Sequence, residues 1–212
     1  MTIEQYLIML KGKGYVPNSI LDIGANVGDF SKFCHGLWQT SKILMIEGNE
    51  NCEPDLAQTG LDYKICLLGD SNKEVEFFMN KKNPKCTGSS YYKEVTEHYA
   101  DSIVTTKRLS RLDDIVDTEY DVIKIDTQGS ELDIMKGGPR TILAAQYIIL
   151  EVATKQYNQG SPMYDDVISY MRGVGFEHNE EIDHHYWMVD DYREFKRGDV
   201  FQVDIIFTRD KI

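Results

Sequence analysis

Long apolar runs are absent from this 212-residue sequence, and so are clusters of basic residues. No segment approaches the roughly 18 apolar residues of a membrane-spanning helix, and the N-terminus lacks the basic and apolar regions of a secretory signal. We therefore expect a cytoplasmic protein with no membrane partner. Lys and Arg number 23 against 35 Asp and Glu, a formal net charge of −12. Because a nucleic-acid backbone is bound by clustered Lys and Arg, this balance argues against nucleic acid as a partner.

Cysteine is also scarce. The four cysteines, Cys34, Cys52, Cys66 and Cys86, show no C-x-x-C spacing and no cluster with histidine, so we predict no zinc site. Cys34 and Cys66 fall within apolar patterns and are expected to be buried and reduced. Repeats and low-complexity tracts are missing too, and the composition is that of an ordinary globular protein. The length and composition together predict one domain over residues 1–212.

A dinucleotide fingerprint is nearly present, but it is incomplete. Residues 19–31 read S-I-L-D-I-G-A-N-V-G-D-F-S, an apolar strand, a glycine turn and the start of a helical pattern. A G-x-G-x-x-G loop would need glycine where Asn26 stands, because that glycine lets the backbone approach a pyrophosphate. The spacing of Gly24 and Gly28 therefore favours a nucleoside ligand without phosphates. S-adenosylmethionine is the common one, and a nicotinamide cofactor is disfavoured.

Acidic residues lie at or near the ends of four apolar runs. Asp22 is the last residue but one of the run 20–23, whereas Glu47 follows residues 43–46, Asp126 follows 122–125 and Glu151 follows 147–150. Ligands of parallel α/β sheets bind outside the carboxyl ends of the strands, so these carboxylates predict the site. Glu47, about 20 residues beyond the glycine turn, has the position of a carboxylate that binds both ribose hydroxyls.

Asp126 is the predicted residue nearest the reacting centre. Its alternative role is to cap the turn that contains Gly129. Glu131 is a second catalytic candidate, although an acid in the first turn of a helix also simply favours the helix dipole. Glu151 could orient an acceptor or join Asp126 in binding magnesium, but two carboxylates alone make a weak magnesium site.

Strands and helices alternate along the chain. Apolar runs predict strands at 20–23, 43–47, 63–68, 75–79, 122–125, 147–150, 176–182 and 200–207, with an extended segment at 104–109. Helical spacing predicts helices at 3–10, 30–37, 53–58, 132–137 and 164–172, and Ser110 with Asp113 predicts a capped short helix. This order indicates a doubly wound α/β fold with helices on both faces. Because no helix joins the last two strands, we expect a seven-stranded, mostly parallel sheet that ends in an antiparallel hairpin.

Several motifs together resemble the FkbM-type S-adenosylmethionine-dependent methyltransferases. The matching pieces are L-D-I-G-A-N-V-G-D-F-S, I-E-G-N-E, L-L-G-D, L-S-R-L-D-D-I, I-K-I-D-T-Q-G-S-E-L-D-I-M-K-G-G, I-I-L-E-V and Q-V-D-I-I-F, in the order of the family. The resemblance implies a class I, Rossmann-like methyltransferase that methylates a hydroxyl group of a small molecule, sugar or glycan. It also implies cofactor-binding roles, at the methionine end for Asp22, Gly24, Asn26 and Gly28, at the ribose for Glu47 and at the adenine for Asp70.

Two segments match the family only loosely and are expected to form the acceptor side of the site. They are residues 80–102 and residues 178–198, of which 183–198 are expected to form a loop. His184 and His185 lie in the second of them, and a histidine from such a segment could serve as the general base, with His184 as the candidate, although surface histidines often have no role. Family members often carry an acid where this chain has Gln128, so we predict no metal.

Three other functions compete with an O-methyltransferase. A nicotinamide-dependent oxidoreductase is disfavoured by Asn26, as above. A nucleic-acid methyltransferase that modifies amino groups usually carries an N/D-P-P-Y-like motif, where this chain reads Asp126-Thr127-Gln128-Gly129. The third is a binding module that kept the fold without catalysis, and the acidic strand ends argue against it. The oligomeric state is not predicted.

Overall fold

Seven strands form the central sheet of the computed structural model, which describes residues 1–188 and 196–209. The strand order is β3-β2-β1-β7-β8-β10-β9. These strands are β1 (Ser19–Ile23), β2 (Lys42–Glu47), β3 (Asp62–Ile65), β7 (Val122–Ile125), β8 (Tyr147–Ala153), β9 (Glu177–Tyr186) and β10 (Val200–Thr208). Only β10 runs antiparallel to its neighbours, β8 and β9. The predicted sheet with its antiparallel C-terminal hairpin is therefore confirmed.

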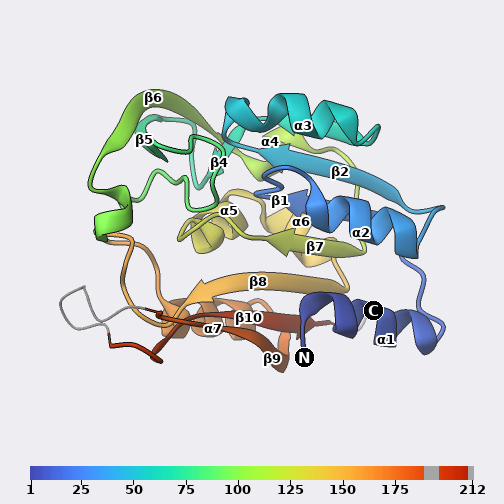
Figure 1. Cartoon of the computed structure of the whole chain (residues 1–212). Coiled ribbons are helices and arrows are strands. Elements are labelled where there is room, and N and C mark those ends of the chain that lie inside the picture. Colours follow the sequence, from blue (N-terminus) through green and yellow to red (C-terminus); the bar gives the residue numbers. More distant parts are fainter. Residues whose placement is uncertain (189–195, 210–212) are drawn as a thin grey trace.

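Helices cover both faces of this sheet (Figure 1). One face packs against α1 (Ile3–Gly12), α2 (Asp29–Leu37) and α3 (Glu53–Gln58), and the other against α4 (Leu112–Ile115), α5 (Glu131–Gly137), α6 (Pro139–Ala144) and α7 (Tyr164–Gly173). Short 3-10 turns occur at η1 (Glu50–Cys52) and η2 (Glu97–Tyr99). In the described ranges, 1–188 and 196–209, no helix is long and apolar enough to cross a membrane.

Side-chain alternation places the polar strand residues on one face. Side chains of successive strand residues point to opposite faces, so Asp22 shares the α1–α2 face with Ile20, and Lys124 shares it with Val122. Asp22 and Lys124 also lie opposite each other in the register of β1 and β7. The other face carries the larger apolar core, to which Leu21 and the residues of α5 and α7 belong. The carboxylates at the strand ends are therefore gathered on one side of the sheet.

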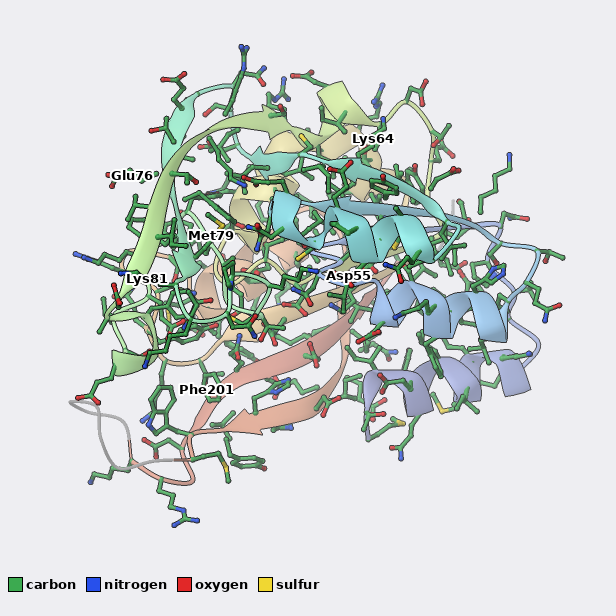
Figure 2. The ribbon with its side chains drawn as sticks, turned by 45° about the horizontal axis from the view of Figure 1, so that its top comes forward. Asp55, Lys64, Glu76, Met79, Lys81 and Phe201 are labelled. Carbon is green, nitrogen blue, oxygen red and sulfur yellow. The ribbon has the colours of Figure 1, made fainter. Side chains whose placement is uncertain are left out.

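A second, three-stranded sheet was only partly predicted. Its order is β4-β6-β5, formed by β4 (Leu67–Gly69), β5 (Glu74–Asn80) and β6 (Ser102–Arg111). The predicted strand at 63–68 is wrong in one respect, because it divides at Cys66. The Cys66 N–H still donates to the Glu47 carbonyl, and the chain then pairs with β6 instead of β2. On β5, Met79 points into the molecule whereas Glu76 points to solvent (Figure 2).

Asp113 caps a different helix from the one expected. The N-cap of α4 is Arg111 and makes no side-chain hydrogen bond, so the predicted cap by Ser110 is wrong. The Asp113 carboxylate instead accepts hydrogen bonds from the N–H groups of Arg140 and Thr141, in the first turn of α6. Helix α6 was not predicted, although Pro139 suits the first position of a helix.

Candidate active site

A tight turn joins β1 to α2 at the carboxyl edge of the sheet. Gly24 (φ 80°) and Gly28 (φ 81°) have left-handed backbone conformations, as does Asn26 (φ 48°). A Cβ added at Gly24 would lie 1.8 Å from the backbone carbonyl oxygen of Asp126. Gly24 is therefore required first by the close packing of its own turn against the end of β7, a reason that is independent of any ligand.

Glu47 is a buried carboxylate at the end of β2. Its Oε2 accepts a hydrogen bond from the Asn26 N–H at 2.7 Å and its Oε1 one from the Asn49 N–H at 2.8 Å. Burial raises the pKa of Glu47, and the two backbone donors act against that rise. Each carboxylate oxygen has capacity for a second donor, so Glu47 can still accept the two hydroxyls of a ribose.

Gly24, Asn26 and Glu47 line a partly open cavity at the carboxyl edge of the sheet. Its apolar wall is formed by Leu67, Leu68, Phe77 and Ile134. The polar end near Gly24 and the apolar wall together fit a nucleoside that carries a polar chain. Residues 86–91, part of the segment expected on the acceptor side, line this same cavity.

The segment before residue 86 is tied to the cofactor-side residues. The Asn26 side-chain amide donates to the Lys85 carbonyl at 3.0 Å, and the Asn49 amide donates to the Pro84 carbonyl at 2.6 Å. Asn49 was not singled out as a site residue in the sequence, although it belongs to the I-E-G-N-E motif. The Asn49 backbone N–H holds Glu47 in place, and its side-chain amide holds the segment that covers the cavity. Asn49 therefore supports the cavity from two sides.

Three of the predicted cofactor residues, Asp22, Gly28 and Asp70, do not line the cavity, and Gly28 packs against Met45 and Leu56 instead. Asp22 is 0% exposed, and its Oδ2 accepts a hydrogen bond from the Ser31 hydroxyl at 2.7 Å. Asp70 lies on the surface, where it forms an ion pair with Lys73 at 3.1 Å. Asp22 therefore lies beneath the glycine turn, and Leu67 and Leu68 of the L-L-G-D motif reach the cavity in place of Asp70.

Asp126 does line the cavity, and it is paired with Lys124. The Lys124 ammonium lies 2.7 Å from Asp126 Oδ2 and is itself only 7% exposed. Burial alone would lower the pKa of Lys124, but the carboxylates of Asp126 and Asp22 raise it above its ordinary value. Burial likewise acts to raise the pKa of Asp126, but the Lys124 ammonium, together with hydrogen bonds to Glu151 and Gln128, lowers that pKa overall. Asp126 is therefore ionised at neutral pH.

A network of amide and hydroxyl groups joins Asp126 to Glu151. The Gln128 side chain donates to Asp126 Oδ1 at 3.2 Å and also donates to Glu151 Oε2. Gln202 on β10 donates to the same Glu151 oxygen at 2.7 Å, and the Tyr157 hydroxyl donates to Gln128 Oε1 at 3.1 Å. The amide at position 128 thus bridges two carboxylates that an acid at that position would repel.

Glu131 closes the loop between β7 and α5. Its carboxylate accepts hydrogen bonds from the Thr127 N–H at 2.8 Å and from the Gly129 N–H at 3.0 Å. Asp126, for which a role in capping this turn was considered, does not bond Gly129 in the described structure. Glu131 thus positions the loop that carries Gln128, and burial raises its pKa to about 7 although the backbone donors act to lower it.

Glu131→Gln should flatten the dependence of stability on pH. Between its unfolded pKa of about 4.3 and its folded pKa, the folded protein binds a proton that the unfolded chain has released. The free energy of unfolding therefore falls as pH rises through this window, by about 4 kcal/mol in all from Glu131. Urea unfolding at pH 5 to 8 measures the difference. Glu53→Gln, at an exposed glutamate in the first turn of α3, is the control, and parallel profiles for Glu131→Gln and the parent would contradict the assignment.

The structure brings His185, and not His184, to the carboxylates. Asp183 has φ 49° and interrupts the pairing of β9 with β10, so that Ile182 lies opposite Asp204 and His185 opposite Gln202. Regular alternation from Ile182 would have turned His184 to the carboxylate face, but the extra residue turns it to the α7 face. There its Nε2 lies 3.9 Å from a carboxylate oxygen of Glu181. The expected loop at 183–198 is thus β9 as far as Tyr186, and residues 189–195 lie outside the described residues.

His185 lies beside Glu151 and Asp204. Its Nε2 is 3.5 Å from Asp204 Oδ2 and 3.8 Å from Glu151 Oε1. Asp204 was not singled out in the sequence, although a lone acid in the apolar run of residues 203–207 is the kind of signal that could have found it. His185 is a different case, because its face depends on the irregularity at Asp183.

Similarity to known proteins agrees with the geometry of the cavity. A family model described as the methyltransferase FkbM domain matches residues 22–178 of the chain. No curated protein matches the chain. Among solved structures, the methyltransferase FkbM of Methylobacillus flagellatus KT is similar at a TM-score of 0.53 and 15% identity, over 91% of this chain and 43% of that one. This chain thus spans less than half of the length of that protein.

Two further solved structures are similar over most of both chains. An S-adenosylmethionine-dependent methyltransferase from Clostridium acetobutylicum ATCC 824 has a TM-score of 0.53 at 8% identity, over 97% of this chain and 89% of its own. Precorrin-6y C5,15-methyltransferase from Geobacter metallireducens GS-15 has a TM-score of 0.51 at 13% identity, over 96% and 86%. Identities this low show the shared fold, and the acceptors of these proteins do not follow from them.

Proposed function

The chain belongs to the FkbM methyltransferase family, whose cofactor is S-adenosylmethionine, and we propose that it methylates a hydroxyl group of a small molecule, sugar or glycan. The observation that carries the proposal is the Asp126 carboxylate, which lines the cofactor cavity and is held ionised by Lys124. An ionised carboxylate at the reacting centre can take the proton that an acceptor hydroxyl loses, because that proton becomes strongly acidic as the oxygen bonds to the methyl carbon.

The cofactor side of the site consists of Gly24, Asn26, Glu47 and Asn49. Bound S-adenosylmethionine supplies a methyl group that its sulfonium has already activated. Glu47 accepts the ribose hydroxyls, and the backbone donors of Asn26 and Asn49 keep its carboxylate in place for them. Leu67, Leu68 and Phe77 exclude water from the nucleoside. The protein's main contribution is then to align the acceptor, and alignment alone can supply a large part of a rate enhancement.

Asp126 acts on the acceptor. Lys124 occupies its Oδ2, so Oδ1 accepts the hydrogen bond from the acceptor hydroxyl and takes its proton. Gln128 donates to the same Oδ1 and fixes its direction, while Glu131 holds the loop that carries Gln128. In this proposal Glu131 is a positioning residue, and His184, which faces α7, takes no part.

Aromatic side chains adjoin the network on the acceptor side. Phe201 packs edge-on against Tyr157, with ring centroids 5.6 Å apart, and against Trp187 at 5.4 Å. Ring faces and edges of this kind suit the apolar faces of a sugar or of a cyclic natural product. Residues 93–96 join this region, since the Val95 N–H donates to the Tyr157 carbonyl at 2.9 Å. We assign acceptor selection to this wall and to residues 183–198.

Glu47→Gln and Asp126→Asn should separate cofactor binding from turnover. Glu47→Gln loses charge-assisted hydrogen bonds worth about 1.5–3 kcal/mol, so binding of S-adenosylhomocysteine should weaken by roughly 10- to 150-fold. Asp126→Asn keeps the shape of the side chain but cannot take a proton. Turnover of any hydroxyl acceptor that the parent protein methylates should therefore fall by about 10²- to 10⁴-fold. Calorimetric titration measures the first effect, and a screen with hydroxylated sugars and natural products measures the second.

Glu50→Gln, at an exposed glutamate three residues beyond Glu47, is the control for the titration. Unchanged S-adenosylhomocysteine binding by Glu47→Gln would contradict the assignment of the ribose site. Binding by the parent protein without turnover of any hydroxyl acceptor would favour the non-catalytic module. Activity that survives in Asp126→Asn would remove Asp126 from the reaction.

A further inference from the structure

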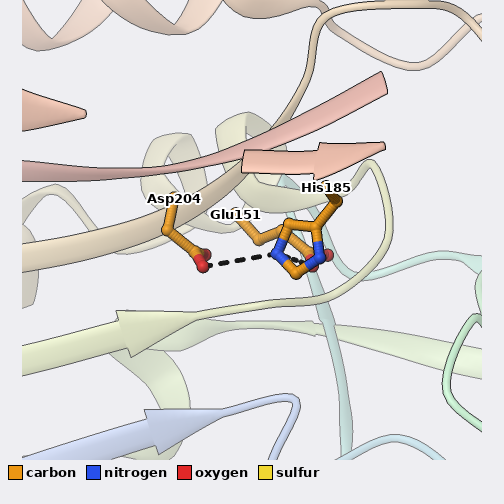
Figure 3. A group of neighbouring side chains, drawn as sticks. All are labelled: Glu151, His185 and Asp204. Atoms are coloured by element: carbon orange, nitrogen blue, oxygen red, sulfur yellow. Dashed lines mark ion pairs between the residues drawn. The ribbon is translucent and has the colours of Figure 1, made fainter. Parts of the chain in front are cut away.

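Three potential metal ligands meet beside the acceptor network. Glu151 on β8, His185 on β9 and Asp204 on β10 each offer one ligand atom, and these atoms all lie within 4.8 Å of one another (Figure 3). Two donors to one divalent ion can be at most two bond lengths apart, which is about 4–5 Å for bonds of 2.0–2.6 Å. The three atoms are therefore already close enough to share one ion with small side-chain movements.

The Glu151 oxygen that faces this cluster is the one to which Gln128 and Gln202 do not donate. Gln128 and Gln202 both donate to Oε2 of Glu151, whereas its Oε1 faces His185. Supporting hydrogen bonds of this kind orient a metal-binding carboxylate and leave its other oxygen available. The amides thus hold Glu151 in the direction that a bound ion would need.

His185 Nε2 points to the same place without a hydrogen bond. This atom is buried and makes no hydrogen bond to any residue among 1–188 and 196–209. Its ion-pair partners, Asp204 Oδ2 at 3.5 Å and Glu151 Oε1 at 3.8 Å, lie at or beyond the limit of hydrogen-bond distance. Native proteins generally satisfy a buried nitrogen more closely than this, by a protein group, water or an ion.

The charge of the surroundings is also unbalanced. Asp22, Asp126, Glu151 and Asp204 all lie on one face of neighbouring strands, and Asp204 is buried with an exposure of 4%. Lys124 is the single lysine or arginine that the described residues place among them, and it is paired with Asp126. Buried carboxylates are normally paired or bind a metal, and Glu151 and Asp204 share His185 as their ion-pair partner, with no lysine or arginine of their own.

From this geometry we propose that Glu151, His185 and Asp204 bind one divalent first-row metal ion. One imidazole with two carboxylates suits Mn²⁺, Fe²⁺ or Zn²⁺ better than the all-oxygen sites that Mg²⁺ and Ca²⁺ prefer. Three protein ligands leave coordination positions open, and the ion lies next to the network of Gln128 that reaches Asp126. A hydroxyl oxygen of the acceptor can take an open position, and this last step rests on the proposed function.

The sequence predicted no metal for a physical reason. It offered only Asp126 and Glu151, which are too few, because His185 and Asp204 come from strands that approach Glu151 only in the folded sheet. A histidine that simply bridges the two carboxylates as an imidazolium is the competing arrangement. It needs no ion, so direct measurement of metal binding distinguishes the two.

The test is a titration of the full chain, stripped with EDTA, with Mn²⁺ followed by electron paramagnetic resonance. We expect one Mn²⁺ per chain, displaced by Zn²⁺. His185→Gln, Asp204→Asn and Glu151→Gln should each weaken Mn²⁺ binding by about 100-fold or more, since even the groups that only orient ligands are worth about 10- to 100-fold. His184→Gln, one residue away but on the other face of β9, is the matched control and should bind Mn²⁺ as the parent does.

Circular dichroism of each variant establishes that it is folded, and three separate ligand variants keep the test informative if one of them is not. A parent protein that binds no Mn²⁺ and no Zn²⁺ would overturn the proposal. The proposal would also be overturned if His185→Gln and Asp204→Asn were both folded and bound Mn²⁺ as tightly as the parent protein. Because no cofactor or acceptor enters the titration, failure of the metal site and failure of the methyltransferase proposal are distinguishable. The latter is read from S-adenosylhomocysteine binding by the parent.

Discussion

Lys124→Met is expected to lower the free energy of unfolding by about 3–5 kcal/mol, although methionine has nearly the length of lysine. Lys124 is 7% exposed and forms a 2.7 Å ion pair with Asp126, and Asp22 lies opposite it across β1 and β7. Removing the ammonium leaves both carboxylates in the interior without their cation, and a buried charge that loses its partner is strongly destabilising. Urea unfolding followed by circular dichroism measures the effect.

Two further variants identify the cause of that loss. Lys73→Met breaks the exposed ion pair with Asp70 and should cost no more than about 1 kcal/mol. The double variant Lys124→Met with Asp126→Asn should be more stable than Lys124→Met alone, because it removes one of the stranded charges. If Lys124→Met costs as little as Lys73→Met, the ammonium is not what balances the charge at the end of β7.

The part of the site that follows from a strand's own sequence was predictable. A parallel strand buried on both faces reads as an apolar run, and the residue after its last apolar position lies at the carboxyl edge of the sheet. Glu47 and Asp126 were recognised in this way, and both line the cavity. Asp22 belongs to the same pattern but lies two residues deeper in the sheet, level with Met45 and Lys124, where the Ser31 hydroxyl covers it. That depth makes it a buried support instead of a surface of the cavity.

The part that depends on pairing between distant segments was not predictable. The phase of β9 changes at Asp183, so the choice between His184 and His185 is made by the register against β10. Likewise, the chain leaves the main sheet after Cys66 because β6 offers a second partner. Alternation within one strand contains no information about such partners.

Gly24→Ala should be the most damaging small substitution in the turn between β1 and α2, costing about 4 kcal/mol or more in the free energy of unfolding. Two separate costs add at this position. The left-handed φ of 80° alone costs an alanine about 1–2 kcal/mol. The new Cβ would also lie 1.8 Å from the Asp126 carbonyl oxygen, a backbone atom that cannot rotate away.

The ends of β1 and β7 cannot easily separate to relieve that contact. The Asp126 N–H donates to the Ile23 carbonyl at 3.0 Å, and the Gly24 N–H donates to the Ile46 carbonyl at 2.9 Å. Gly60→Ala isolates the backbone term, since Gly60 has φ 72° with no atom within 4 Å of an added Cβ, and it should cost only about 1–2 kcal/mol. Urea unfolding of the two variants measures the difference. Equal losses would mean that the turn relaxes freely; a larger loss in Gly24→Ala would mean that the position of Asp126 is fixed by this glycine.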